Sequence, residues 1–297
     1  MDNKLALLFI GAGASLWGII GIFVTYLYEI GFTPTQVVAV RALSATIFLV
    51  IYVLFKNRQL LKINVSDSKY FVGTGIFSIV LFNWCLFSAI EETSISIASI
   101  LLYTAPAFVT IFSRLLFKEA LTTRKVLALF ITFIGCSFVI GILPNMDEPV
   151  SLYGVILGLG SGLFYSLYSI FGKFALKKYD SLTVTVYTFL FATIAVIPFS
   201  SLWSVLPLFL DIKVWMYIIG LGFLSTMLPF IFYTKGLNTI ESSRASIIAT
   251  IEPVVASLMG FLIFHEKLNL CQYLGIIMVI AAVVIVQEST KRQVQKR

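Results

Sequence analysis

Ten apolar runs follow one another along this chain, each close to the ~20 residues that a helix needs to cross the hydrocarbon of a bilayer. They cover residues 5–26, 34–55, 70–89, 95–112, 126–143, 152–172, 182–203, 214–234, 242–264 and 268–286. Hydrophobic residues make up 59% of the chain and charged residues 12%, which is more apolar surface than a water-soluble fold can bury. The sequence therefore predicts an all-α integral membrane protein with ten transmembrane helices.

The positions of Lys and Arg test this count, because cytoplasmic loops collect these residues and external loops do not. With ten spans, one side of the membrane receives only Lys213 and Lys267. The other side receives Lys4, Lys56, Arg58, Lys62, Lys69, Arg114, Lys118, Arg124, Lys125, Lys173, Lys177, Lys178, Lys235, Arg244, Lys291, Arg292, Lys296 and Arg297. We therefore expect both termini to be cytoplasmic and the protein to be a multi-pass protein of the cell (plasma or inner) membrane.

The two halves of the chain repeat each other at a fixed distance. Pro106 maps to Pro253 and Glu119 to Glu266, in each case 147 residues later, and the shift needs no gap. The same shift relates residues in all five helices, including Gly11 with Gly158, Ala45-Thr46-Ile47 with Ala192-Thr193-Ile194, Gly73 with Gly220, and Ala98-Ser99-Ile100 with Ala245-Ser246-Ile247. We therefore predict two five-helix domains, residues 1–145 and 150–297.

Because five is an odd number, the second domain must enter the membrane from the opposite face, which makes the pair an inverted repeat. Inverted repeats can exchange conformations around a site near the bilayer midplane and so open it to each side in turn. The repeat is thus the strongest indication of a transporter.

Two segments carry a family resemblance. Residues 98–135, with Pro106 and the sequence Phe117-Lys118-Glu119, and the second copy from Glu252-Pro253 through Glu266 to Gly275 resemble the EamA domain of the drug/metabolite transporter superfamily. The likeness covers nearly the whole chain, and Arg41 resembles an Arg often found in the second helix of that family. It implies a secondary transporter, and often an exporter, of amino acids or other small metabolites. The first copy departs from the second in having Ala105 where the second has Glu252.

Composition argues against several other classes of protein. Cys85, Cys136 and Cys271 are far apart and form no CxxC pair, and His265 is the single histidine, so we expect no metal site, disulfide framework or cofactor. The net charge is +7, but the basic residues lie between apolar segments instead of forming one stripe. We therefore expect no nucleic-acid partner. No GxxxxGK[ST] loop for ATP is present.

Arg41 and Glu252 are charged residues placed well inside predicted spans, whereas Arg244 lies at the cytoplasmic edge of the ninth. A lone cation there costs roughly 2.5–3.5 kcal/mol on insertion scales, so Arg41 must face protein or water. It could contact an anion or pair with a carboxylate, although a static clamp on helix-end carbonyls is the interpretation that its position favours. Glu252 could exchange protons or attract a cation; alternatively, it is a protonated group bonded to backbone freed by Pro253. We name Glu252 and Arg41 as candidate coupling residues.

Midplane positions that are equivalent in the two copies should line a site on the pseudo-two-fold axis. Aromatic rings around a carboxylate would suit an organic cation through cation–π attraction, although aromatic residues in apolar helices usually only pack. The candidate substrate-binding residues are Trp17, Asn83, Tyr103, Phe164, Tyr165, Phe230, Thr250 and Glu252, with Tyr168 adding aromatic surface.

We therefore expect a secondary active transporter, not an enzyme, that exports a small metabolite such as an amino acid or organic cation by alternating access. Its partners are then a small-molecule substrate, membrane lipid and, if Glu252 couples transport, protons. It would act as a monomer or homodimer. The alternative is a channel or lipid-handling protein, against which stands the absence of charge rings or a carbonyl filter in the sequence. If Arg41 and Glu252 both reach the cavity, a zwitterion fits; if only Glu252 does, a cation fits better.

Overall fold

The computed structural model describes residues 1–141 and 151–294, with side chains up to Gln287, and these residues form helices without strands. In the first half the helices are α1 (Asn3–Gly18), α2 (Ile20–Ile30), α3 (Pro34–Lys56), η1 (Arg58–Leu61), η2 (Val65–Asp67), α4 (Ser68–Phe71), η3 (Val72–Val80), α5 (Leu81–Glu92), α6 (Ile95–Leu102), α7 (Ala105–Phe117) and α8 (Thr123–Ile140).

The second half continues with α9 (Leu152–Ala175), α10 (Ser181–Val196), η4 (Ile197–Phe199), η5 (Leu202–Leu210), α11 (Ile212–Ile219), η6 (Gly220–Met227), α12 (Leu228–Thr239), α13 (Ser242–Ala249), α14 (Ile251–Ile263) and α15 (Leu270–Val294). Several of these elements join end to end, so that the described residues contain ten helical stretches long and apolar enough to cross a membrane. The prediction of an all-helical protein with ten spans is confirmed.

Several predicted boundaries differ from the structure by up to five residues. The third span, for example, begins at Val65 instead of residue 70, and the fourth ends at Phe117 instead of residue 112. The seventh span ends at Phe199, short of the predicted residue 203, because Ser201 adopts a left-handed backbone with φ of 50° and a separate 3₁₀-helix follows. The predicted end of the fifth span, residues 142–143, lies outside the described residues, as do Lys296 and Arg297.

Local sequence explains where several helices begin. Thr33 and Gln36 form a capping box at the start of α3, and Pro34 occupies the first turn, where its missing N–H costs no hydrogen bond. The hydroxyl of Thr122 caps α8 by accepting a hydrogen bond from Lys125 N, and Asn269 caps α15 by accepting one from Gln272 N. Thr122 and Asn269 are 147 residues apart, so the same device starts the last helix of each half.

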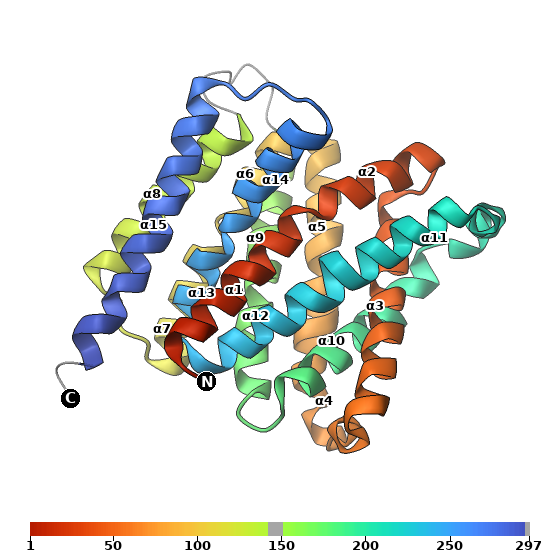
Figure 1. Ribbon diagram of the computed structural model, residues 1–297, viewed down its shortest axis with the longest axis horizontal. Helices are drawn as coiled ribbons and strands as arrows, with labels where there is room; N and C mark the ends of the chain where they lie inside the picture. Colours follow the sequence, from red (N-terminus) through yellow and green to blue (C-terminus); the bar gives the residue numbers. More distant parts are fainter. Residues whose placement is uncertain (142–150, 295–297) are drawn as a thin grey trace.

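The spacing of 147 also appears in the helix boundaries and the packing. α6 begins at Ile95 and α13 at Ser242, while α5 begins at Leu81 and α12 at Leu228. α1 packs on α12, and correspondingly α9 packs on α5, while α3 packs on α10 and α8 on α15 (Figure 1). Equivalent helices of the two halves thus make equivalent contacts.

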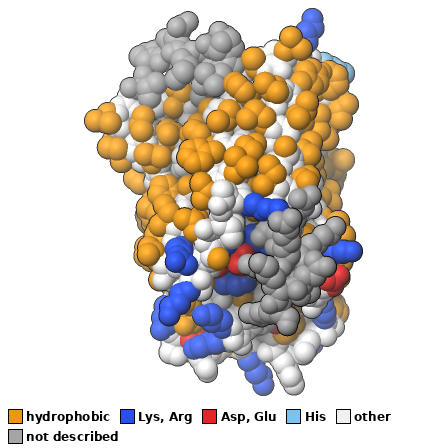
Figure 2. Space-filling model, turned by 90° about the vertical axis from the view of Figure 1, so that its left-hand side faces the viewer, with side chains coloured by type: hydrophobic (Ala, Val, Ile, Leu, Met, Phe, Trp, Pro, Cys, Tyr) orange, Lys and Arg blue, Asp and Glu red, His pale blue; other side chains and the backbone are white. Residues whose placement is uncertain are grey.

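The surface is divided into apolar and basic regions. Side chains of Leu8, Phe130, Ile194 and Leu270 are each more than 60% exposed, which suits contact with lipid. Figure 2 shows hydrophobic side chains over the upper part of one face and Lys and Arg gathered toward its lower end. The beginning of α1 and the end of α15 both lie toward this lower end (Figure 1).

Candidate functional site

A cavity of about 210 Å³ lies among α1, α2, α3, η3, α5, α6, α9, α12 and α14. Seven of the residues singled out from the sequence line it: Trp17, Arg41, Asn83, Tyr165, Tyr168, Phe230 and Glu252. They come from six different helices in both halves of the chain, so the cavity exists only when the two halves are packed together.

The other three candidates do not line this cavity. Tyr103 packs beside Val254 and Val279, and Phe164 packs against the cluster around Cys85. Thr250 is 2% exposed and its hydroxyl donates to Ile247 O at 2.6 Å. Sequence equivalence placed these residues near the axis, but the direction of each side chain depends on helix rotation, which the spacing does not determine.

Arg41 enters the cavity from the second turn of α3. Its Nε donates a hydrogen bond to Thr226 Oγ1 at 2.9 Å, and Thr226 in turn donates to Leu221 O at 2.7 Å in the π-helical segment η6. Arg41 also interacts electrostatically with Glu252. The guanidinium is therefore held by one hydrogen bond to the other half of the chain while it also faces the cavity.

Glu252 lies in the first turn of α14, not in the interior of one long helix. α13 ends at Ala249 and α14 begins at Ile251, so the ninth span is broken at Thr250. Pro253 follows in that first turn, where backbone N–H groups have no helical partner, so its missing N–H costs α14 no hydrogen bond. The Glu252 carboxyl thus lies at the positive end of the α14 dipole, and Tyr165 lies within interaction range of it.

The fourth span is broken in the same way. α6 ends at Leu102 and α7 begins at Ala105, with Pro106 in its first turn. Ala105 takes the place of Glu252 there, so one carboxylate faces the cavity among the described lining residues. Half-helices that meet near the midplane are a recurrent way of building transporter sites.

Sequence reasoning missed several lining residues, including Tyr28, Ser78, Ser169 and Tyr233. Ser78 has a signal in the sequence, because it maps to Ser225 by the 147-residue shift. Tyr28, Ser169 and Tyr233 map to Ala175, Ile22 and Leu86. Because these three residues have apolar counterparts in the other half, a search for polar residues at equivalent positions cannot find them.

One end of the cavity is sealed by polar contacts between α9 and α12. The hydroxyls of Tyr168 and Thr234 share a hydrogen bond, and Ser169 Oγ lies 2.7 Å from Tyr233 Oη. One turn further on, Lys173 Nζ donates to Leu237 O and Ile240 O, at 2.6 Å each. These contacts lie between the cavity and the Lys- and Arg-rich end of the molecule.

At the opposite end the cavity reaches Tyr28, in the last turn of α2, and Val37, in the first turn of α3. Tyr28 is 38% exposed. The cavity therefore extends toward the end of the molecule that carries few cationic residues, and it is closed toward the other end.

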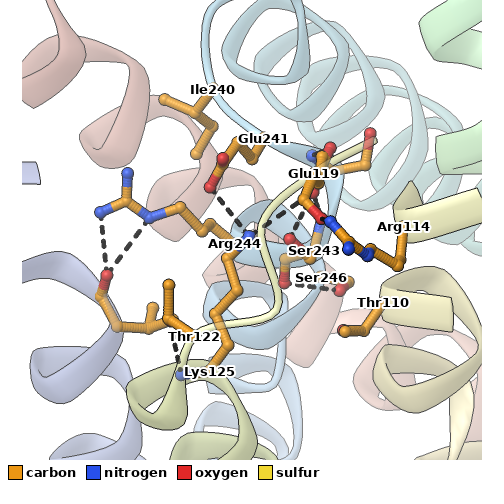
Figure 3. A network of polar contacts seen from close by, with 12 residues as sticks. Thr110, Arg114, Glu119, Thr122, Lys125, Ile240, Glu241, Ser243, Arg244 and Ser246 are labelled. Atoms are coloured by element: carbon orange, nitrogen blue, oxygen red, sulfur yellow. Dashed lines mark hydrogen bonds and ion pairs between the residues drawn. The ribbon is translucent and has the colours of Figure 1, made fainter. Parts of the chain in front are cut away.

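A second polar network lies at the closed end, where α13 begins (Figure 3). Glu119 accepts hydrogen bonds from Ser242 N at 2.7 Å and Ser243 N at 3.2 Å, and one from the Ser243 hydroxyl. Lys125 Nζ lies 3.0 Å from a Glu241 carboxylate oxygen and 3.8 Å from Glu119. Glu119, from the first half of the chain, thus caps a half-helix of the second.

Ten apolar helices around a cavity lined by charged and aromatic residues define a polytopic membrane protein. The model of the EamA-like transporter family matches residues 4–141 and 152–287, and the chain belongs to this family. It is therefore a membrane transporter with a small-molecule substrate, a class of protein that is generally not enzymatic.

Known relatives agree with this assignment. Two uncharacterized transporters of Archaeoglobus fulgidus are 31% identical over 67% of this chain and 69% of the relative, and 30% identical over 92% and 95%. The uncharacterized transporter YyaM of Bacillus subtilis is 28% identical over 86% of this chain and 85% of the relative. A solved crystal structure is similar in fold, with a TM-score of 0.81, 16% identity and coverage of 98% and 99%.

Proposed function

We propose that this protein is a secondary active transporter that moves a zwitterionic small metabolite, of amino-acid type, out of the cell by alternating access. The observation that carries the proposal is that Arg41 and Glu252 both line one cavity. A cation and an anion on different walls suit a substrate that carries both charges, whereas Glu252 alone would suit an organic cation.

The cavity surface supports a substrate with an apolar part. Trp17, Tyr168, Phe230 and Tyr233 stack edge to face or tilted, with ring centroids 5.0–6.1 Å apart. Such a cluster presents a rigid apolar wall, while Asn83 and Ser78 add polar groups to the lining. A volume of about 210 Å³ restricts the cargo to small molecules.

For the mechanism, we propose that residues 1–145 and 150–297 are two inverted five-helix repeats with both termini in the cytoplasm of a cell-membrane protein. The equivalent helix boundaries, the equivalent packing and the basic residues at one end support this arrangement. In this conformation the cavity is then closed toward the cytoplasm and extends toward the outside of the cell. Exchange of the roles of the two repeats would produce the opposite state.

Proton coupling at Glu252 belongs to the same proposal. Glu252 is the one carboxylate among the described lining residues, and protonation would remove its attraction for the substrate ammonium and for Arg41. A proton arriving from outside would thereby promote substrate release.

A ligand screen tests the substrate class. Purified protein is heated with amino acids, quaternary amines, nucleosides or sugars, and a ligand at 100 times its dissociation constant stabilises by about 2.7 kcal/mol. We expect an amino acid to raise the melting temperature, and we expect both Glu252→Gln and Arg41→Gln to abolish that shift. A quaternary amine that depends on Glu252 alone would replace the zwitterion by an organic cation.

Counterflow in proteoliposomes tests the mechanism. Preloaded unlabelled substrate should drive transient accumulation of labelled substrate, because alternating access exchanges one molecule for another. A channel dissipates the gradient without such accumulation, so simple equilibration would contradict the transporter mechanism. An imposed pH gradient should drive accumulation in the parent and not in Glu252→Gln.

A further inference from the structure

The short helices α6 and α13 occupy equivalent places in the two halves, yet their environments differ. All eight residues of α13 (Ser242–Ala249) are buried. In α6 (Ile95–Leu102), Ala98 is the buried residue and Ile95 is 69% exposed. Since the two sequences share Ala-Ser-Ile at matching positions, the difference comes from packing: one half-helix is enclosed and its counterpart is not.

The enclosed half-helix is capped by a residue from the other half of the chain. Glu241, at the N-cap position of α13, makes no side-chain cap of its own. The Glu119 carboxylate instead accepts from the N–H groups of Ser242 and Ser243 and from the Ser243 hydroxyl (Figure 3). Its side chain is 8% exposed. Two N–H groups that a helix start leaves unpaired are thereby satisfied.

The counterpart of Glu119 is Glu266, and the loops that hold the two residues are alike. Lys118 and His265 precede them with φ of 56° in both cases. Glu119 N donates to Ser113 O and Glu266 N donates to Gly260 O, each at 3.2 Å. Ser113 and Gly260 are again 147 residues apart, so both glutamates leave the backbone from the same kind of turn.

Glu266 makes no cap in this state. Its residue is exposed and its carboxylate lies against Gly260. The start of α6, which is the equivalent target, has Ser94 Oγ accepting from Ile97 N at 3.3 Å, and within the described part of the chain the N–H groups of Ile95 and Ser96 have no acceptor. Ser96 of α6 matches Ser243 of α13. The start of α6 therefore carries a hydroxyl at the position equivalent to the one that binds Glu119.

We propose that Glu119 and Glu266 are alternating caps that position the two half-helices in turn. Glu119 binds the start of α13 when the Lys- and Arg-rich end is closed, and Glu266 binds the start of α6 when the opposite end is closed. Each cap stabilises one of the two states, so together they set the equilibrium between them. This inference rests on the alternating access of the proposed function.

Thiol labelling at two equivalent positions tests the caps. In a background with Cys85, Cys136 and Cys271 replaced by Ala, single cysteines are placed at Ile95→Cys or Ser242→Cys and are reacted with a membrane-impermeant maleimide. Glu119→Gln should raise the labelling rate at 242 and lower it at 95. Glu266→Gln should do the opposite. The ratio of the two labelling rates should change about fivefold, which corresponds to the ~1 kcal/mol typical of an N-cap.

The effect at the distant end is the decisive one. If Glu119 is only a local cap, Glu119→Gln raises labelling at 242 and leaves 95 unchanged, and that result would overturn the proposal. The double variant Glu119→Gln/Glu266→Gln lacks both caps, so both labelling rates should return toward those of the parent. This recovery would also show that the variants fold. Glu241→Gln is the matched control, because it removes a neighbouring carboxylate without removing the cap.

Labelling reports conformation and not flux, so it separates this inference from the proposed function. Opposite shifts in a protein that shows no counterflow would support the caps and contradict the transport mechanism. Normal counterflow together with unshifted labelling at 95 would contradict the caps alone.

Discussion

Thr46 and Thr193 occupy the same position in the two halves of the chain, and their hydroxyl oxygens lie 2.9 Å apart between α3 and α10. If the two halves form the proposed inverted repeat, residues related by its two-fold axis can touch in this way only beside the axis itself. This hydrogen bond would then lie next to the axis.

This contact predicts unequal effects of two similar substitutions. Thr46 Oγ1 also lies 2.8 Å from Ala42 O, so its single proton goes to that carbonyl and Thr193 donates to Thr46. Thr46→Val then removes the acceptor of Thr193, whereas Thr193→Val leaves Thr46 bonded to Ala42. Denaturant unfolding in detergent should show Thr46→Val to be the more destabilising by about 1 kcal/mol. Equal losses would reject this direction of donation.

Close contact between helices predicts a second pair of effects. A Cβ on Gly75 would lie 2.5 Å from Thr188 O and 3.0 Å from Ala192 N, which are backbone atoms of α10. A Cβ on Gly222 would meet the Ser44 hydroxyl, which can rotate, but would also lie 2.7 Å from Ser44 Cβ, which cannot. Gly75→Ala and Gly222→Ala should therefore each destabilise by about 1–3 kcal/mol.

The control for these glycines is Gly21, where a Cβ meets no atom within 4 Å. Gly21→Ala should leave the melting temperature unchanged or raise it, because alanine favours the helix. A loss at Gly21 as large as that at Gly75 would show that helix flexibility, not packing, determines these effects.

Lys125 carries a third prediction. Its side chain is 1% exposed, between Glu119 and Glu241, so Lys125→Met would leave two carboxylates close together without their cation. The free energy of unfolding should fall by on the order of 3 kcal/mol. This is the lower end of the range for breaking a buried ion pair, because Glu241 is 34% exposed. Lys125→Met/Glu241→Gln should recover part of that loss in thermal unfolding, and a double variant less stable than the single one would contradict this electrostatic account.

Lys178 predicts a pH dependence at the loop that follows α9. The Asp67 carboxylate accepts a hydrogen bond from Lys178 Nζ at 2.7 Å and raises the pKa of this lysine above its ordinary value. Since the folded pKa is the higher one, the stabilisation is fully present below about pH 10.4, the unfolded value. It is lost as the pH rises through the folded pKa.

Melting temperatures measured between neutral and alkaline pH would show this loss in the parent. Lys178→Met should lower the melting temperature at neutral pH and reduce its alkaline decline. Lys177→Met is the matched control, because Lys177 lies over the rings of Phe117 and Phe174 instead of beside Asp67. The effect should be small, since Lys178 is 52% exposed. An alkaline decline identical in parent and Lys178→Met would contradict the assignment.

The sequence was most informative where one physical requirement dominates. Hydrocarbon demands long apolar helices, so the ten spans were predictable, but the breaks before Pro106 and Pro253 were not, since both spans were expected to be continuous. Which side chains face the cavity was less predictable. Trp17 and Phe164 are equivalent in sequence, but Trp17 lines the cavity and Phe164 packs against the cluster around Cys85, because equivalent helices are packed differently in the two halves.

The replacement of Glu252 by Ala105 in the other half has a consequence for stoichiometry. A pair of matched carboxylates would give the substrate chamber two titratable groups and would let one turnover carry two protons. Among the described lining residues the cavity has one carboxylate. If transport is coupled to protons through Glu252, as we propose, a single proton is exchanged per cycle, and the driving force for the cargo is limited by the same ratio.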